Sequence, residues 1–372
     1  MNPVNEMITV CHVITGDIWA GAEAQSFSLV RALNRNKLIN VEVIVFNSGE
    51  LYEKIQNENI KVSLVSEDDN NTLEIIYKVY KEIKKCNADI VHAHGFKENF
   101  TAGLAARLCS KKVIRTHHGK GMVSGSGIRA YIEKINEKYL TNKIIAVSED
   151  LKKYLVDLGY DEERIKVIHN GVECQKKSSC RSTNLKKLFC TDSHKRVIGI
   201  VGRLVPVKNH RCFLDSARAT LDRFSNVYFV VVGDGPLMSE LREYARVLQI
   251  EESVHFAGYV NNVDEYLENF DILSFTSFHE GIPIAMLEAM CIGVPVVATK
   301  VGGVSEIIQH EISGLLVPNN DSKALSSAYI QLLSNDKFYN QISINSINEA
   351  INVHSLENSV VSTINLYKRT VL

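Results

Sequence analysis

The sequence predicts an α/β protein built from two doubly wound parallel sheets. Short apolar runs rich in β-branched residues alternate with helical stretches along both halves of the chain, an order typical of parallel sheets covered on both faces. A polar stretch without periodicity interrupts this order near the middle. At 372 residues the chain is also longer than one hydrophobic core usually grows. We therefore expect two domains, each with its own sheet.

The first half alternates strands and helices. The expected strands are 8–15, 41–46, 61–65, 89–94, 112–118 and 143–148. The expected helices are 22–33, 51–58, 73–86, 99–108, 128–140 and 149–159. Helix 128–140 is amphipathic, and its packed side is expected to hold Ile128, Tyr131, Ile132 and Ile135. Its opposite side holds Arg129, Lys134 and Lys138.

The second half restarts the same order. Its expected strands are 196–204, 227–236, 254–260, 271–277, 293–299 and 313–318. Helices are expected over 211–221, 237–248, 263–269 and most of 322–372. The predicted organisation is a first domain over 1–172, a linker over 173–195, a second domain over 196–354 and a helix over 355–372 that can cross back to the first domain. Ligands of such sheets bind at the carboxyl ends of the strands, so we expect the site there.

The charge is nearly balanced overall but uneven along the chain. A net charge of −1 argues against a general nucleic-acid-binding protein. Between Ile75 and Ala146, however, fourteen Lys/Arg stand against five Asp/Glu. This excess suits a peripheral contact with an anionic membrane, and it equally suits solvated helix surfaces.

The eight cysteines include no C-x-x-C pair, which favours free thiols in a reducing cytoplasm. The spacing of Cys174, Cys180, Cys190 and His194 matches no usual zinc pattern, so we expect no metal site. The first residues lack the basic start of a secretory signal, and no apolar window reaches transmembrane length. We therefore expect a cytoplasmic protein.

Residues 279–299, HEGIPIAMLEAMCIGVPVVAT, combine two acids with a predicted helix start. Pro283 suits the first helical turn, and Gly281 lets the backbone approach a ligand closely. A helix N-terminus attracts anions, whereas Glu280 and Glu288 repel them. We therefore expect the two carboxylates to bind neutral donors, such as sugar or ribose hydroxyls, beside a phosphate.

Other strand ends of the second half also suit a nucleotide. The loop GRLVPVKN offers Arg203 and Lys208, two permanent cations that can clamp a diphosphate. Glycines follow two further strands, in VVVGDGP and VGGVSEII. Each signal also has a plain structural interpretation, as surface cations or tight turns, so no single motif decides the chemistry.

Taken in order, these motifs resemble the retaining glycosyltransferases of family 4, the glycosyl transferases group 1. The resemblance is most specific in EGIPIAMLEA (280–289), similar to that family's E-x7-E signature, and in GRLVPVKN (202–209). It extends through AGAE (20–23), VHAHG (91–95), RTHHG (115–119), IAVSEDL (145–151) and IHNGV (168–172). The resemblance implies the GT-B fold, in which two Rossmann-like domains face each other across a cleft.

The resemblance also implies a nucleotide-diphosphate sugar as donor, with no metal or other cofactor. By that resemblance Arg203 and Lys208 bind the donor's diphosphate, and Glu288 binds the ribose hydroxyls. The transferred sugar is then held by Glu280 and the backbone of Gly281, Ile282, Pro283 and Ile284.

In the first half, the family loop usually reads GGAE, whereas here Ala20 replaces the first glycine. Gly21 remains and can let the backbone approach phosphate or sugar.

Alternation along a strand sorts the histidines of the first half. The family's histidine directly precedes the glycine of RTHHG, which selects His118. Thr116 and His118 share one side of the strand, so His117 is expected to pack on the other face. The same alternation applies to His92 and His94, and His94 can line the acceptor side.

The predicted reaction is transfer of a hexose to an acceptor hydroxyl with retention at the anomeric carbon. The cations and the helix start stabilise the departing diphosphate in place of a metal. The resemblance further implies that the leaving phosphate takes the acceptor proton and that His118 positions the sugar and stabilises charge. The expected acceptor is a saccharide or a lipid-linked sugar of a bacterial surface polysaccharide, lipopolysaccharide or capsule, at the inner face of the membrane.

Three alternatives remain open at this point. A nucleotide-sugar 2-epimerase shares the GT-B fold and the donors, although the phosphate-clamp loop and the E-x7-E spacing favour transfer. A non-catalytic nucleotide-sugar-binding protein would not need Glu280, Glu288, Arg203 and Lys208 intact. An NAD-dependent oxidoreductase needs G-x-G-x-x-G after the first strand, which TGDIWAGAE does not supply.

Overall fold

The computed structural model describes residues 7–17, 19–120, 128–174 and 195–372, with the backbone alone at residue 128. The chain divides into two compact units. Unit 1 comprises Met1–Gly171 and Leu356–Leu372, and unit 2 comprises Val172–Ser355. Most of the predicted linker, residues 175–194, lies outside the described residues.

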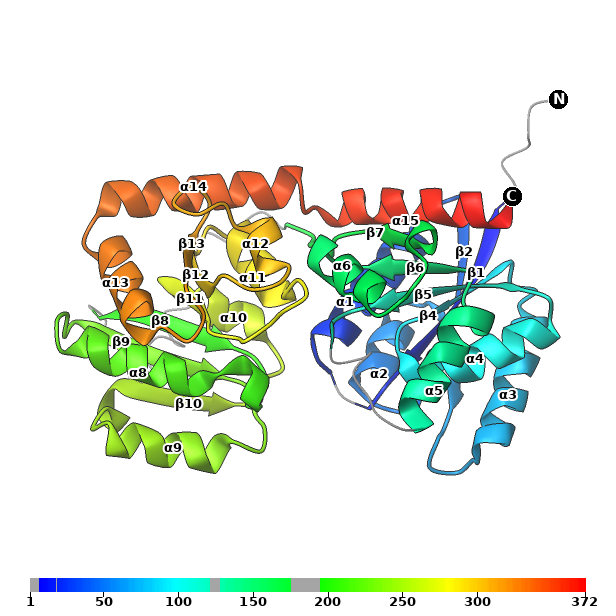
Figure 1. The fold of residues 1–372 in the computed structure, drawn as a ribbon, viewed down its shortest axis with the longest axis horizontal. Coiled ribbons are helices and arrows are strands. Elements are labelled where there is room, and N and C mark those ends of the chain that lie inside the picture. Colours follow the sequence, from blue (N-terminus) through cyan, green and yellow to red (C-terminus); the bar gives the residue numbers. More distant parts are fainter. Residues whose placement is uncertain (1–6, 18, 121–127, 175–194) are drawn as a thin grey trace. The chain divides into compact units, whose positions relative to one another are not determined.

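Unit 1 contains a sheet of seven parallel strands in the order β3-β2-β1-β4-β5-β6-β7 (Figure 1). The strands are β1 (Ile8–Thr15), β2 (Ile39–Phe46), β3 (Lys61–Val65), β4 (Ile90–Ala93), β5 (Lys112–His117), β6 (Lys143–Ala146) and β7 (Ile165–Val167). The sequence did not predict β7, because three residues are too few to show a period.

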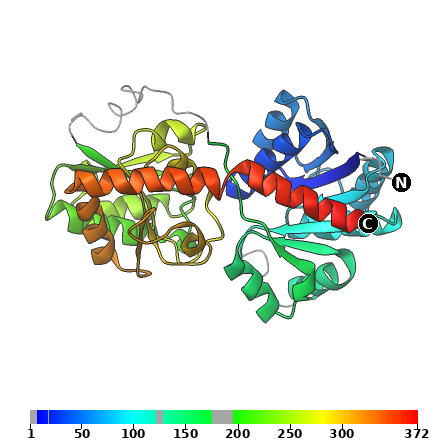
Figure 2. The same ribbon diagram turned by 90° about the horizontal axis from the view of Figure 1, so that it is seen from above.

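Helices cover both faces of this sheet. They are α1 (Gly21–Asn34), α2 (Glu50–Asn57), α3 (Thr72–Lys85), α4 (Phe96–Leu108), α5 (Ile128–Ile135), the π-helical turn η2 (Asn136–Leu140), α6 (Glu149–Asp157) and α15 (Leu356–Val371). Val10 and Ile14 of β1 pack with α1, α2 and α15, whereas Cys11 and Val13 pack with α3 and α4, as strand alternation requires. Figure 2 shows α15 lying along the sheet of unit 1.

Unit 2 contains six parallel strands in the order β10-β9-β8-β11-β12-β13. The strands are β8 (Arg196–Val201), β9 (Val227–Val232), β10 (Val254–Gly258), β11 (Ile272–Phe275), β12 (Val296–Thr299) and β13 (Leu315–Val317). The helices are η4 (Pro206–Lys208), α8 (His210–Leu221), α9 (Met238–Val247), α10 (Val263–Leu267), α11 (Ile284–Cys291), α12 (Val304–Ile307), α13 (Ser322–Leu333) and α14 (Asp336–Asn352). One face packs against α8, α9 and α13, and the other packs against α11.

The cysteine prediction is partly wrong. Cys174 and Cys291 form a disulfide across 117 positions of sequence, with their Cα atoms 5.2 Å apart. Both side chains pack at the edge of the same apolar cluster, because the end of α11 lies beside residue 174. Cys11, Cys86, Cys109 and Cys212 are free thiols. Of the zinc alternative, Cys174 is therefore engaged, and Cys180, Cys190 and His194 lie outside the described residues.

Within the described part of the chain, no helix combines the length and apolarity that crossing a membrane requires.

Candidate functional site

In unit 2 the loops after β8 and β11 are joined by a half-buried polar contact. Lys208 Nζ lies 2.6 Å from Glu280 Oε1, and Ser277 Oγ donates to the same oxygen at 2.5 Å. Thr276 Oγ1 donates to the backbone carbonyls of Lys208 and Asn209 at 2.9 and 3.0 Å. The cation assigned to the diphosphate and the acid assigned to the sugar are therefore direct partners in the free protein.

Two glycine-rich loops pack against each other at the same sheet edge. The N–H of Gly303 donates to the carbonyl of Glu280 at 3.2 Å. A Cβ at position 303 would lie 2.3 Å from the carbonyl oxygen of Gly281, so no larger residue fits without moving the loop. Gly303 of VGGVSEII thus holds the EGIP segment in place.

Helix α11 begins one residue later than the sequence predicts. Pro283 is the N-cap, with φ −66° and ψ 126°, and not a residue of the first turn. Its extended ψ places Ile284 first in the helix, and the N–H groups of this turn have no partner within the helix. Ile282 is 5 % exposed and packs in the core, so only its backbone can contact a ligand.

Glu288 lies on α11, and its side chain is half-buried. Burial, and then the charge of Asp264, raise the pKa of its carboxyl to about 7. A ligand that donates hydrogen bonds to Glu288 therefore stabilises the carboxylate form, which burial disfavours. Arg203 follows β8 on an exposed position, where its guanidinium can meet an anion.

The remaining predicted site residues, Gly21 and His118, belong to unit 1. Gly21 opens α1, and a Cβ built there meets no atom within 4 Å. Packing within the described chain therefore does not require glycine at this position.

His118 lines a small pocket of unit 1. The lining residues are Gln25, Ser26, Leu29, His94, Thr116, His118, Ile145, Val147, Ile168, Asn170, Ser359 and Thr363. Burial lowers the pKa of His118 to about 4, so the imidazole is neutral at pH 7. Both of its ring nitrogens are without a hydrogen-bond partner among the described residues.

The alternation predicted for the histidines is confirmed. Thr116 and His118 line the same pocket, together with His94. His117 is fully buried and lies edge-on to Tyr160, with ring centroids 5.9 Å apart.

Sequence reasoning missed a buried cluster next to this pocket. His12, His92 and His94 place ligand nitrogens within 4.8 Å of one another, a spacing that can hold a metal ion. Their six ring nitrogens all have hydrogen-bond partners, which include Tyr367 of α15. His12 and His92 are register partners on adjacent strands, but Tyr367 follows His12 by 355 positions, and no local pattern predicts that contact.

The predicted orientation of helix 128–140 is wrong for Tyr131, which was expected on the packed side. Tyr131 is 68 % exposed, whereas Glu133 is 5 % exposed. Glu133 faces inward because the buried guanidinium of Arg115 needs a counter-charge, and their closest atoms lie 2.6 Å apart. The side chain of Ile128, predicted to be packed, is not described.

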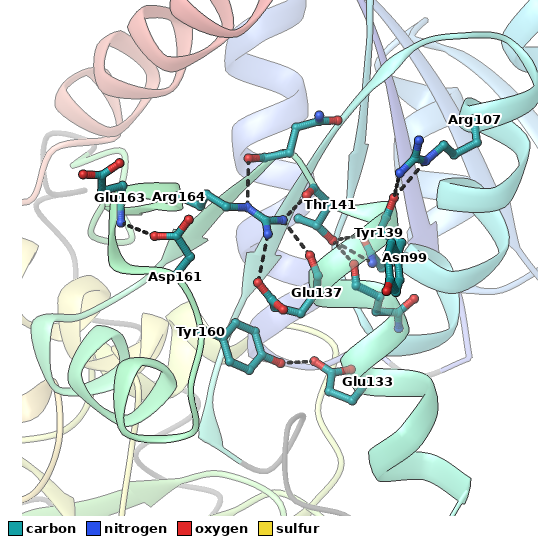
Figure 3. Close-up of polar contacts among 12 residues, drawn as sticks. Asn99, Arg107, Glu133, Glu137, Tyr139, Thr141, Tyr160, Asp161, Glu163 and Arg164 are labelled. Carbon is teal, nitrogen blue, oxygen red and sulfur yellow. Dashed lines mark hydrogen bonds and ion pairs between the residues drawn. The ribbon is translucent and has the colours of Figure 1, made fainter.

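Figure 3 shows how this helix is attached to unit 1. Tyr160 donates to Glu133, and Arg164 Nη1 lies 2.9 Å from Glu137 Oε1. Arg107 Nε donates to the carbonyl of Tyr139 at 2.8 Å. Both acids of the helix are thus used in contacts within the unit. The exposed side chains of α5 and η2 are Arg129, Tyr131, Lys134, Lys138 and Tyr139.

Two doubly wound parallel sheets, with cations, acids and a helix start at the strand ends, define the GT-B class. The model of the glycosyl transferases group 1 family matches residues 184–349, and the model of Glycosyltransferase Family 4 matches residues 19–176. Together these two matches cover most of the chain, which therefore belongs to the glycosyl transferases group 1 family and is a glycosyltransferase.

Curated relatives of the chain include bacterial glycosyltransferases, one of which is named for capsular polysaccharide biosynthesis. The chain is 27 % identical to the Escherichia coli UDP-Gal:alpha-D-GlcNAc-diphosphoundecaprenol alpha-1,3-galactosyltransferase, over 99 % of this chain and 98 % of that protein. It is 25 % identical to the Staphylococcus aureus capsular polysaccharide biosynthesis glycosyltransferase CapH, over 82 % and 84 % of the two chains.

Among solved structures, Anabaena HepE in complex with UDP-glucose shares the fold. Its TM-score is 0.87 at 20 % identity, over 97 % of this chain and 100 % of that chain.

Proposed function

We propose that this chain transfers a hexose from a nucleotide-diphosphate sugar to an acceptor hydroxyl, with retention at the anomeric carbon. The observation that carries the proposal is the Lys208–Glu280 contact of 2.6 Å at the sheet edge where α11 begins. A cation, an acid and free helix N–H groups together match a diphosphate joined to a sugar.

Binding exchanges partners within this contact. The diphosphate takes the ammonium of Lys208. Arg203 supplies further positive charge, and the backbone N–H groups of Gly281 and Ile284 supply donors, since Pro283 has none. Oε1 of Glu280 then loses its contact with Lys208 and can accept a hydrogen bond from a hydroxyl of the transferred sugar. Glu288 accepts the ribose hydroxyls through its carboxylate.

In the transfer step the bond between the anomeric carbon and the phosphate oxygen breaks, and its electron pair leaves with the diphosphate. The acceptor oxygen forms the new bond on the same face of the sugar and gives its proton to the departing phosphate. His118, neutral at pH 7, holds a sugar hydroxyl and does not act as a nucleophile. The charge of the leaving group is met by Lys208, Arg203 and α11, without a metal.

The acceptor is inferred to be a lipid-linked saccharide in the cytoplasm. The support comes from the galactosyltransferase of Escherichia coli, whose name gives a diphosphoundecaprenol-linked sugar as its acceptor, and from the capsular relative.

The test uses UDP-galactose, UDP-glucose and GDP-mannose as probes. A nucleotide sugar that binds only the folded state raises the melting temperature. With the active donor, an α-linked product seen by NMR from an α-linked donor supports retaining transfer. A sugar epimerised at C2, whether free or still joined to the nucleotide, would instead show the 2-epimerase. Binding without turnover over a panel of lipid-linked and free saccharides would show the non-catalytic alternative. Lys208→Ala should abolish the shift, whereas Lys337→Ala, at an exposed position of the same unit, should not.

We also propose that unit 1 contacts anionic membrane through the exposed side chains of α3, α5 and η2. On α5 and η2 the exposed set contains three cations and two tyrosines, because Glu133 and Glu137 point inward. On α3, Lys78, Lys81, Lys84 and Lys85 are exposed beside Tyr77, which is 56 % exposed. Cations with amphipathic aromatic rings suit a headgroup layer.

The predicted basic surface is smaller than the charge count suggests. Arg115 is 1 % exposed and pairs with Glu133, and Lys120 lies 2.7 Å from Asp150. Co-sedimentation with vesicles containing anionic lipid should fall steeply with salt and weaken in Lys134→Glu/Lys138→Glu. The matched control is Lys300→Glu/Lys337→Glu in unit 2, which should bind as the natural protein does. Equal binding by both double variants, or none at low salt, overturns the membrane contact.

A further inference from the structure

The disulfide between Cys174 and Cys291 lies where unit 2 begins and where its helix α11 ends. The chain enters unit 2 at Val172, two residues before Cys174, and Cys291 is the last residue of α11. The two Cα atoms are 5.2 Å apart, within the usual range for a disulfide, so the bond forms without displacing either backbone. Both residues are half-buried, so a small thiol can approach the bond.

The entering segment is also joined to the segment by which the chain leaves unit 2. The N–H of Val172 donates to the carbonyl of His354 at 3.0 Å, and Val172 forms a parallel bridge with Ser355, the last residue of the unit. Among the described cysteines, Cys174 and Cys291 are the bonded pair and the other four are free. The disulfide therefore attaches both connections of unit 2 to α11 at one point.

Helix α11 links this bond to the proposed donor site. It has eight residues, begins after Pro283 and ends at Cys291. Glu288 precedes Cys291 by three positions, so the two side chains are neighbours on one side of the helix. Eight residues make a helix only about 12 Å long. A displacement of its last turn therefore also displaces Glu288 and the N–H groups of its first turn.

The proposed function gives the bond its chemical context. It places the chain in the cytoplasm, where small thiols keep most cysteines reduced and the disulfides that do form are usually transient. In such exchange the thiolate of glutathione attacks one sulfur of the bond, and the other cysteine leaves as a thiolate. A second glutathione then releases the first cysteine. The protein disulfide gains two electrons and two protons, and one molecule of glutathione disulfide forms.

We propose that Cys174 and Cys291 form a reversible thiol–disulfide site that sets donor affinity through α11. In the disulfide state the last turn of α11 is fixed to the entry of unit 2, and Glu288 and the first turn are preorganised for the nucleotide-diphosphate sugar. In the dithiol state this restraint is lost, and donor binding must also order the helix. The coupling to the donor rests on the proposed function, whereas the exchange reaction does not.

The direct test measures donor affinity in the two states. Titration calorimetry with UDP-galactose, UDP-glucose and GDP-mannose is run on protein equilibrated with glutathione disulfide and on protein reduced with dithiothreitol. The donor that binds should bind about 5-fold more weakly to the reduced protein, at the lower end of typical coupling between sites. Alkylation of free thiols followed by mass spectrometry establishes whether Cys174 and Cys291 are bonded in each sample.

Variants separate the bond from other effects of the reductant. Cys174→Ser removes the bond and leaves α11 unchanged, so it should bind the donor as weakly as the reduced natural protein and show no further change with dithiothreitol. Cys291→Ser should do the same. Cys109→Ser is the matched control, because it removes a half-buried free thiol of unit 1, and it should respond as the natural protein does. Thermal unfolding checks that each variant is folded, and loss of the bond should lower the melting temperature by about 5 °C or more.

Linkage supplies an independent measure of the same coupling. If the disulfide state binds the donor about 5-fold more tightly, a saturating donor must favour the disulfide by the same factor. The equilibrium constant for reduction by glutathione, read from the alkylated fraction over a series of glutathione ratios, should fall by that factor with the donor present. The free sugar of that donor, added alone, should leave the constant unchanged.

Each outcome decides one part of the proposal. Equal donor affinity in the two states, with an unshifted reduction equilibrium, overturns the coupling and leaves the proposed function intact. A pair that stays bonded, or stays reduced, at every glutathione ratio overturns the reversible site. Failure of every nucleotide sugar to bind in either state overturns both the coupling and the proposed function.

Discussion

The two units present different chemistry at the carboxyl ends of similar parallel sheets. Unit 2 places Lys208 and Glu280 in direct contact and adds Glu288 nearby in sequence. The pocket of unit 1 is lined by hydroxyls, two amides, two imidazoles and apolar side chains, with no charged side chain among the described lining residues. Because the sheets share one architecture, the difference comes from the loops and the strand faces. Charge suits the diphosphate, and the neutral pocket suits the sugar.

The largest expected effect is on the stability of unit 1 and concerns its buried ion pair, Arg115–Glu133. Glu133→Ala leaves the guanidinium buried without a counter-charge and should lower the free energy of unfolding of unit 1 by about 3–5 kcal/mol. Trp19, the single tryptophan, lies in unit 1 and reports its unfolding by fluorescence. Lys85→Ala breaks an exposed pair with Glu82 and should cost less than about 1 kcal/mol. If Glu133→Ala and Lys85→Ala lowered the free energy of unfolding equally, the buried pair would be no more important for stability than the exposed one.

The next effect concerns unit 2 and turnover. Glu280→Gln should lower kcat by about 100-fold, because the sugar contact matters most in the transition state, and should change donor affinity little. Glu288→Ala should mainly weaken nucleotide binding. Steady-state kinetics with direct binding measurements separate the two. If both variants change kcat and affinity alike, the division of roles between the two acids is wrong.

A smaller effect is the pH dependence of donor binding. In the free protein the pKa of Glu288 is raised to about 7, and a ribose hydroxyl that donates to the carboxylate favours the ionised form. Affinity for a UDP-sugar should therefore rise about tenfold from pH 6 to pH 8 and level off above. Titration calorimetry should show proton release on binding near pH 6.5. Glu288→Gln should remove both, and an unchanged profile in that variant would assign the titration elsewhere.

Ionisation of Glu288 has the opposite effect on the stability of the free protein: affinity for the donor rises with pH, whereas stability falls. Folding raises the pKa of the Glu288 carboxyl, so ionising this group destabilises the folded protein. The loss of stability begins as the pH rises above the pKa of the unfolded state and is complete above the folded pKa of about 7. Glu288→Gln should therefore raise the melting temperature of the free protein at pH 8 and leave it nearly unchanged at pH 4. A similar gain at both pH values would show that the effect does not come from ionisation.

The smallest expected effect is that of chelation. EDTA should leave activity unchanged, since cations and a helix start already meet the charge of the diphosphate. Loss of activity that Mn²⁺ or Mg²⁺ restores would contradict this. Loss that only a nitrogen-preferring metal such as Zn²⁺ restores would point to His12, His92 and His94 as its ligands.

The parts of the fold that a local period encodes could be predicted from the sequence. The runs that became β1 and β3 have the bounds expected for them, because strand and turn signals lie within a few residues of each other. Alternation along β5 placed Thr116 and His118 together for the same reason. The sequence motifs also located the segment that contains Lys208 and Glu280.

What the sequence did not predict depends on contacts between distant residues. Cys174 and Cys291 meet because α11 ends beside the entry to unit 2, across 117 positions. The inward turn of Glu133 depends on the buried Arg115, which lies on another element. A helical period ranks residues by polarity, so it places an acid outside unless a buried cation is known in advance.

The position of α15 in unit 1 has a consequence for synthesis on the ribosome. Unit 1 begins with the first strand but is completed by the helix made last among the described elements. All of unit 2 emerges before that helix, and domains fold largely as they emerge. During this interval the sheet face that α15 covers, including Ile14 and Val43, lacks its final cover. The nascent chain therefore exposes an apolar surface that chaperones can bind. Tyr367, the partner of His12 and His92, arrives together with that helix.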